Sequence, residues 1–342
     1  MIEEFDGGMI ARAILKIEDS RDSALDQTLW PDESRAVALQ GLHRSGPICR
    51  ILPVHPDAYI GEAQLNQALG STDMSKKYSR PDTNNPLVRP SGRLIVNADD
   101  WGRDCETTDR TFDCIPCGTV SSVSAMVFME DSERAAAMAC EHGIDAGLHL
   151  NFTTSFTGAK FPRRLQECQQ SVARFLSRHS MARAVFNPWL VRPFEYLVAA
   201  QREEFIRLYG TDAERFDGHH HMHLCSNVLI GKLLPPGKLV RRYFSYEPGQ
   251  DIRNRVYRRF TDALLVRRHR VVDLFFSLPP LQPERLTRIF SLTRRLVVEV
   301  ETHPAHLDEY RFLTGSEILR WTEACPVAPR YEFRPGDAIE SR

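Results

Sequence analysis

From about residue 93 onward, short apolar runs alternate with longer segments in which apolar residues recur at helical spacing. This alternation is typical of βα units arranged around a parallel sheet. Seven runs are predicted to be strands: 93–98, 121–128, 145–150, 215–224, 238–244, 271–277 and 296–303. Three clear helices are predicted at 132–143, 192–210 and 251–270, and Gly143 is expected to end the first of them.

About seven strands over roughly 240 residues predict an α/β fold of the (β/α)-barrel type, similar to a TIM barrel, complete or with one unit missing or irregular. A doubly wound open sheet is the alternative, although no glycine-rich phosphate loop follows the first strand. In a barrel the C-terminal ends of the strands meet on one face. Residues far apart in the sequence can therefore come together there.

The first part of the chain differs from the rest. Residues 1–90 contain few long periodic segments, and 71–92 are rich in Ser, Pro, Asn and charged residues. We expect a poorly ordered N-terminal extension and linker over 1–90, followed by one α/β domain over 91–342. Met74 is a candidate translation start, which would make the first 73 residues dispensable.

The composition narrows the class of protein. Of the 342 residues 42% are hydrophobic and 26% charged, as in soluble globular proteins, and the formal net charge of −1 gives no sign of nucleic-acid binding. No apolar run is long enough to span a bilayer, and the chain starts with acidic residues where a secretory signal would be basic. We expect a cytoplasmic protein without membrane insertion, whose eight cysteines, Cys114 and Cys117 included, are reduced thiols.

Four predicted strands end in carboxylate or imidazole groups instead of neutral turn residues. These are Asp99 and Asp100 on the first, His149 on the third, the run from Asp217 to His223 on the fourth, and His303 on the last. Two imidazoles and one carboxylate are a common ligand set for a catalytic divalent metal. We therefore predict one divalent metal ion, Mg²⁺ or Zn²⁺, at this end of the sheet.

If the chain is still extended at Asp99 and Asp100, their adjacent carboxylates point in different directions, because side chains alternate along an extended chain. One could bind the cation while the other takes a proton from a water bound to it. An Asp-Asp turn that caps the next helix is the alternative. His303 lies where Pro304 stops its strand, and its imidazole is suited to protonate a leaving amine.

The segment 217–223 holds four of the chain's twelve histidines. On an extended strand His219, His221 and His223 would share one face and His220 the other, so not all of them can reach one metal. We assign His219 as the ligand and Asp217 as a carboxylate that orients a ligand. The roles of the other three histidines stay open, and a surface histidine cluster is the alternative.

Four ordered motifs resemble those of a known family, the YdjC-like carbohydrate deacetylases. They are NADDWG at 97–102, GLH at 147–149, DGHHHMH at 217–223 and ETHP at 301–304, and the similarity runs from about 93 to 310. The resemblance implies a (β/α)-barrel-like fold and removal of an N-acetyl group from an acetamido sugar. A small carbohydrate is then the expected partner, and a homodimer is compatible with the sequence.

Carried over by position, the resemblance implies Asp99 as general base, Asp100, His149 and His219 as metal ligands, and His303 as general acid. The chain departs from the family's usual Phe at Trp101, its usual Ser at Gly218, and its usual helix start after Gly102. Two other functions stay open: a non-catalytic metal- or polysaccharide-binding protein, for which the arginine-rich stretch 253–270 offers a surface, and a metal-dependent hydrolase of another amide or ester.

Overall fold

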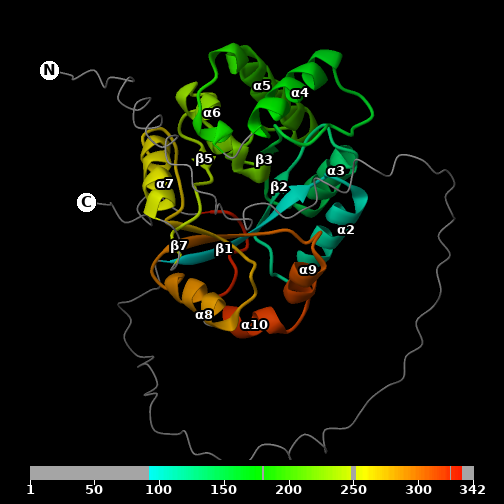
Figure 1. Cartoon of the computed structure of the whole chain (residues 1–342). Coiled ribbons are helices and arrows are strands. Elements are labelled where there is room, and N and C mark those ends of the chain that lie inside the picture. The colour runs from blue at the N-terminus through cyan, green and yellow to red at the C-terminus, as the bar shows by residue number, and fades with distance from the viewer. Residues whose placement is uncertain (1–91, 179–180, 248–251, 324, 333–342) are drawn as a thin grey trace, which may run out of the picture. The chain divides into compact units, whose positions relative to one another are not determined.

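The computed structural model describes residues 92–178, 181–247, 252–323 and 325–332. The predicted extension over 1–90, with Met74 in it, lies outside these residues. Within the described part, strands and helices alternate along the chain as the hydrophobic pattern predicts (Figure 1).

The strands are β1 (Arg93–Trp101), β2 (Ser122–Ala125), β3 (Ala146–Leu150), β4 (Arg215–Gly218), β5 (Leu239–Val240), β6 (Leu274–Ser277) and β7 (Val297–Thr302). The helices are α2 (Cys105–Cys114), α3 (Ser132–His142), α4 (Arg163–Leu176), α5 (Val191–Tyr209), α6 (Ser226–Ile230), α7 (Ile252–Leu265), α8 (Pro283–Leu292), α9 (Leu307–Thr314) and α10 (Glu317–Thr322). Short 3-10 helices lie at η3 (Ala182–Ala184), η4 (Pro188–Leu190) and η5 (His219–Leu224). Among the described residues, no helix combines the length and the apolarity that a membrane crossing requires.

All seven strands are parallel and form one sheet in the order β5-β4-β3-β2-β1-β7-β6. This order follows the chain in a cycle, with β7 beside β1, which confirms the predicted (β/α)-barrel-like fold. The helices lie around the outside of the curled sheet (Figure 1). Between the edge strands, a single parallel bridge joins Leu239 to Arg270, and the Ser245 N–H donates to the Phe275 carbonyl at 2.8 Å. Over the described residues, the sheet thus has seven strands, against eight in a TIM barrel.

Alternation along β1 separates the two faces of the sheet. Leu94, Val96 and Ala98 pack in the large core shared with the helices. Ile95, on the opposite face, belongs to a smaller apolar cluster with Leu239, Val272, Phe275, Val297, Ala328 and Tyr331. Asn97 and Asp99 continue the Ile95 face toward the strand ends. The inward face thus changes from apolar to polar along the strand.

The chain's last described segment closes the amino end of the barrel. Val327 forms a parallel bridge with Leu94, and the Tyr331 hydroxyl donates to Glu299 at 2.5 Å. The Tyr331 N–H donates to Asp145 at 2.9 Å. The polar carboxyl end of the sheet is therefore left as the place for a site, as in other barrels.

Local signals explain where several helices begin and end. Asp104 accepts a hydrogen bond from the Thr107 N–H at 2.8 Å and begins α2, and Gly143, with a φ of 63°, ends α3 as predicted. The predicted strand 215–224 is too long. It ends at Gly218, because His220 and His221 adopt left-handed φ angles of 54° and 56° and turn the chain into η5. The expectation that alternate histidines share one strand face is therefore wrong.

Candidate functional site

Asp99 and Asp100 both face the mouth of the barrel, although they are adjacent in sequence. Asp100 has a φ of 64°, and the pairing of β1 with β2 is irregular between Ala98 and Trp101. This left-handed turn brings the Asp100 carboxylate toward the mouth beside Asp99. Asp tolerates the conformation better than most residues. The prediction that the two carboxylates point apart was made for an extended chain, and the left-handed turn at Asp100 removes that condition.

Asp100, His149 and His219 lie close enough to hold one cation. Oδ1 of Asp100 is 2.9 Å from Nδ1 of His219 and 3.3 Å from Nε2 of His149, and one ligand atom from each residue lies within 4.8 Å of the others. Ligand atoms at tetrahedral angles around Zn²⁺ would be about 3.4 Å apart. The spacing and the donor set therefore fit a single divalent cation.

The electrostatics of this cluster also favour a cation. Burial alone would lower the pKa of His149, but Asp99, Asp100 and Asp217 together raise it to about 10. The cluster thus attracts positive charge onto the imidazole. Burial opposes ionisation of Asp100 in the same way, yet His219 and His149 hold its pKa well below the ordinary value.

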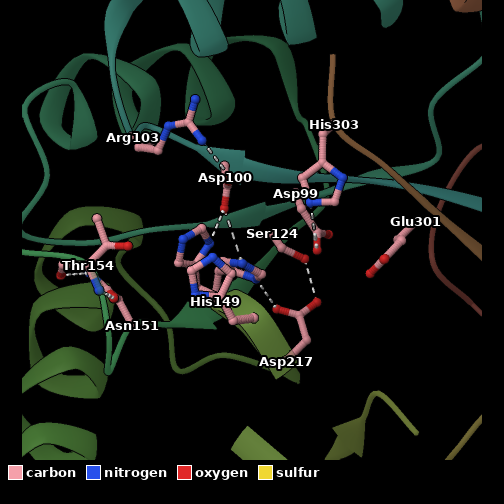
Figure 2. A network of polar contacts seen from close by, with 12 residues as sticks. Asp99, Asp100, Arg103, Ser124, His149, Asn151, Thr154, Asp217, Glu301 and His303 are labelled. Carbon is pink, nitrogen blue, oxygen red and sulfur yellow. Dashed lines mark hydrogen bonds and ion pairs between the residues drawn. The ribbon is translucent and has the colours of Figure 1, made fainter. Parts of the chain in front are cut away.

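Hydrogen bonds fix the orientation of the ligand candidates. Asp217 Oδ1 lies 2.8 Å from His149 Nδ1, so Nε2 of that ring faces Asp100. The other Asp217 oxygen accepts from the Ser124 hydroxyl at 2.5 Å, and Arg103 donates to Asp100 Oδ2 at 2.9 Å (Figure 2). A carboxylate behind a ligating imidazole sets its tautomer and its direction. Asp217 contacts His149, as an orienting carboxylate would, and this role stays a prediction.

Replacement of Asp217 by Asn is expected to weaken binding of the divalent metal about 10- to 100-fold, because the His149 ring loses its charged partner. Ser124→Ala is the matched control, since it removes a neutral hydrogen bond to the same carboxylate, together with the one that Asn97 donates to Ser124 at 2.7 Å. Titration of metal-free protein with Zn²⁺ measures both affinities. Equal losses for the two variants would count against the orienting role.

Asp99 forms a salt bridge with Arg241, a residue that the sequence analysis did not identify. Arg241 donates to both of its oxygens, at 2.6 and 2.7 Å, and Asn97 donates to Oδ1 at 2.8 Å. Burial tends to raise the pKa of Asp99, but Arg241 and then His149 hold it below the ordinary value. Asp99 is therefore an oriented, ionised carboxylate beside the triad.

Arg241 is fully buried and connects four carboxylates. Besides Asp99, it contacts Glu299 at 2.7 Å, Asp217 at 3.1 Å and Glu301 at 3.4 Å. The sequence of the run 238–244 indicates this inward direction. Val240 packs in the core between the sheet and the helices, so alternation along the strand points Arg241 to the inside of the barrel. The run is rich in arginine, however, and the sequence alone does not tell the buried one from its neighbour.

His303 follows the end of β7, near Asp99. Its Nε2 lies 4.0 Å from Asp99 Oδ2, and its side chain is 28% exposed (Figure 2). The His303 N–H and the Thr302 hydroxyl both donate to Glu309, at 2.8 and 2.7 Å. Desolvation tends to lower the pKa of His303, but Asp99 and Glu301 outweigh it and the pKa is raised. The neighbouring carboxylates thus favour the protonated imidazole.

Two of the remaining histidines have structural contacts. His220 Nδ1 lies 3.0 Å from the Thr153 hydroxyl, which ties η5 to the loop after β3. His223 is buried, with its Nε2 3.0 Å from the Arg241 carbonyl, so it holds the backbone that carries the buried arginine. The structure therefore brings together all five predicted site residues. Of the two further histidines, His220 packs on the ligand candidate His219, with ring centroids 4.0 Å apart.

Comparisons with known proteins show the family of this chain. A model of the YdjC-like protein family matches residues 93–324. The chain is 28% identical over 242 residues to a carbohydrate deacetylase of Brevibacillus brevis, covering 67% of this chain and 87% of the relative. It is 29% identical over 143 residues to a carbohydrate deacetylase of Mus musculus, covering 42% of this chain and 46% of the relative. The chain thus spans about half the length of the mouse relative.

A solved structure shares the fold. The putative cellobiose-phosphate cleavage protein of Enterococcus faecalis superposes with a TM-score of 0.52 at 19% identity. The match covers 69% of this chain and 96% of that protein. At this identity the similarity supports the architecture alone.

Proposed function

Because the chain belongs to the YdjC-like family, we propose that it is a metal-dependent hydrolase that removes the N-acetyl group from an acetamido sugar of the N-acetylglucosamine type. The observation that carries the proposal is the triad Asp100, His149 and His219 beside the Arg241-bound Asp99. The names of the relatives in the comparisons support the carbohydrate substrate. A cytoplasmic location and a homodimer stay predictions from the sequence.

A divalent cation held by Asp100, His149 and His219 would polarise the acetamide carbonyl and make the attacking water more acidic. Asp99 takes a proton from that water, and the water oxygen bonds to the carbonyl carbon. Arg241 keeps the Asp99 carboxylate ionised and fixed in direction. As the C–N bond breaks, His303 gives its proton to the nitrogen, so acetate and a free amine leave.

The pH dependence of kcat/KM is expected to be broad and to fall on the alkaline side. The general acid must be protonated, and the pKa of His303 lies above its ordinary value, so activity persists through neutral pH and declines as pH rises through the raised pKa. The pKa of Asp99 lies below its ordinary value, so the base is ionised down to acidic pH. A His303→Gln variant should be slower and should lose this alkaline decline at constant metal content. If kcat/KM of this variant still falls at alkaline pH as in wild type, the decline belongs to a group other than His303.

The proposed activity is tested by acetate release. Purified protein supplied with Zn²⁺ or Mg²⁺ is incubated with N-acetylglucosamine, its short oligomers and related acetamido sugars, with a phosphate ester and simple amides as comparison substrates. We expect acetate from at least one sugar and no comparable turnover of the others. Turnover of the phosphate ester alone would overturn the proposal, and binding without turnover of any sugar would favour a non-catalytic protein.

A further inference from the structure

His221 and Glu301 face each other in the mouth of the barrel and have no role in the scheme above. Both His220 and His221 adopt left-handed backbone angles, a conformation that costs of order 1 kcal/mol or more for residues other than Gly. This turn separates His221 from the neighbouring ligand His219. His221 Nε2 instead lies 3.6 Å from Glu301 Oε2.

The pair is spaced too widely for a direct hydrogen bond. At 3.6 Å the two atoms exceed the usual range, whereas Arg241 and Asp99 meet at 2.6 Å close by. Nδ1 of His221 is buried without a hydrogen-bond partner, and the ring lies edge-on to Phe244 at 4.5 Å. With its proton assigned to Nε2, the ring is a donor directed at an acceptor-only carboxylate. A hydroxyl group can satisfy both at once, because it accepts and donates.

The pair lies beside the reacting groups. Glu301 Oε2 and Asp99 Oδ2 both contact Arg241 NH1, at 3.4 and 2.6 Å. Glu301 lies on β7, two residues before His303, which follows the end of that strand. Figure 2 shows Glu301 on the far side of Asp99 from His149. The ligand triad and the Glu301–His221 pair therefore flank the base and the acid from opposite sides. A group next to the leaving nitrogen of a substrate would therefore lie against the Glu301–His221 pair.

We propose that Glu301 and His221 bind a hydroxyl group on the carbon next to the one that carries the acetamido group. The inference rests on the proposed function and assigns two residues that would recognise the hydroxyl beside the acetamido group of a 2-acetamido sugar. The imidazole donates to the hydroxyl oxygen and the hydroxyl donates to the carboxylate. Phe244 stacks on Phe275 with ring centroids 4.8 Å apart. Its edge contact with the His221 imidazole, at 4.5 Å, fixes the position of that ring.

The test compares N-acetylglucosamine with its 1-deoxy and 3-deoxy analogues. In wild type, kcat/KM for one analogue should fall about 10- to 100-fold below the parent sugar, the effect of a lost hydrogen bond to a charged group. Glu301→Gln and His221→Asn should lower kcat/KM for the parent by a similar factor, mainly through KM, and should reduce the discrimination to near one. Asn suits His221 because it adopts the left-handed conformation readily.

Glu299→Gln is the matched control, because Glu299 contacts Arg241 at 2.7 Å but is fully buried away from the mouth. It should keep the full discrimination between sugars. If wild type does not discriminate, or if Glu301→Gln behaves like Glu299→Gln, the inference is overturned while the deacetylase proposal stands. If no sugar releases acetate, the deacetylase proposal fails. Calorimetry then measures the affinity of wild type for the same three sugars. The inference stands if one deoxy analogue binds about 10- to 100-fold more weakly than N-acetylglucosamine, and it is overturned if all three bind alike.

Discussion

An Asp99→Asn enzyme is expected to bind its metal normally and to release acetate about 10²- to 10⁴-fold more slowly than wild type, the usual contribution of a general base. Asn has nearly the same shape as Asp, so it leaves the cation triad in place but cannot accept the proton from water. The measurement is kcat together with the metal content of the same sample. A rate within a few-fold of wild type would remove Asp99 from the mechanism.

Asp100→Asn is the matched control for this prediction. It makes the same chemical change one residue later, and Asn tolerates the φ of 64° at this position, so backbone strain does not explain its effect. We expect this variant to lose metal and activity together, because its carboxylate oxygen lies 2.9 and 3.3 Å from the two imidazoles. Equal metal loss in both variants would contradict the division of roles.

Arg241→Met is expected to lower the free energy of unfolding by about 3–5 kcal/mol, in addition to abolishing activity. The arginine is fully buried, and its removal leaves Asp99, Asp217, Glu299 and Glu301 without their shared cation. Arg241→Lys should be less destabilising, yet slow, because an ammonium group cannot hold both oxygens of Asp99. Denaturant unfolding and kcat measure the two effects.

The neighbouring arginine provides the control. Arg242 pairs with Asp262 at 2.5 Å, but both side chains are partly exposed, at 21% and 18%. Arg242 also donates to the Val272 and Asp273 carbonyls, so Arg242→Met should cost some stability. The cost should be clearly smaller than for Arg241→Met, because no fully buried carboxylate loses its cation. If the Arg241→Met and Arg242→Met variants lose the same free energy of unfolding, the buried carboxylates around Arg241 do not contribute the stability that their contacts suggest.

The barrel-like fold could be predicted because nearly every strand has an apolar outward face. Apolar and other residues alternate along the sequences of β1 and β3. The helices between these strands have ordinary capping residues, such as Gly143 at the end of α3. The site's location followed from the convergence of strand ends at Asp99, His149 and His303. Each of these residues interrupts an apolar run, and a side chain that costs free energy to bury needs a compensating partner.

Other features of the site depend on backbone angles or on partners that a single sequence does not reveal. The left-handed conformation of Asp100 interrupts the extended chain, and two such conformations inside the histidine run, at His220 and His221, turn the chain into η5 after β4. Neither position has the Gly that would have signalled a turn. Arg241 was missed because the run 238–244 contains two adjacent arginines. Only the three-dimensional contacts show that one of them faces the carboxylates.

The central claim is that a divalent cation at Asp100, His149 and His219 supports removal of an acetyl group from a sugar. The most direct measurement strips the protein of metal with a chelator and titrates Zn²⁺ back, recording bound metal and acetate release from the best sugar substrate in the same samples. We predict that acetate release is absent at first and rises in proportion to the bound metal, reaching its limit at one ion per chain. Acetate release at the full rate from metal-free protein would contradict the account.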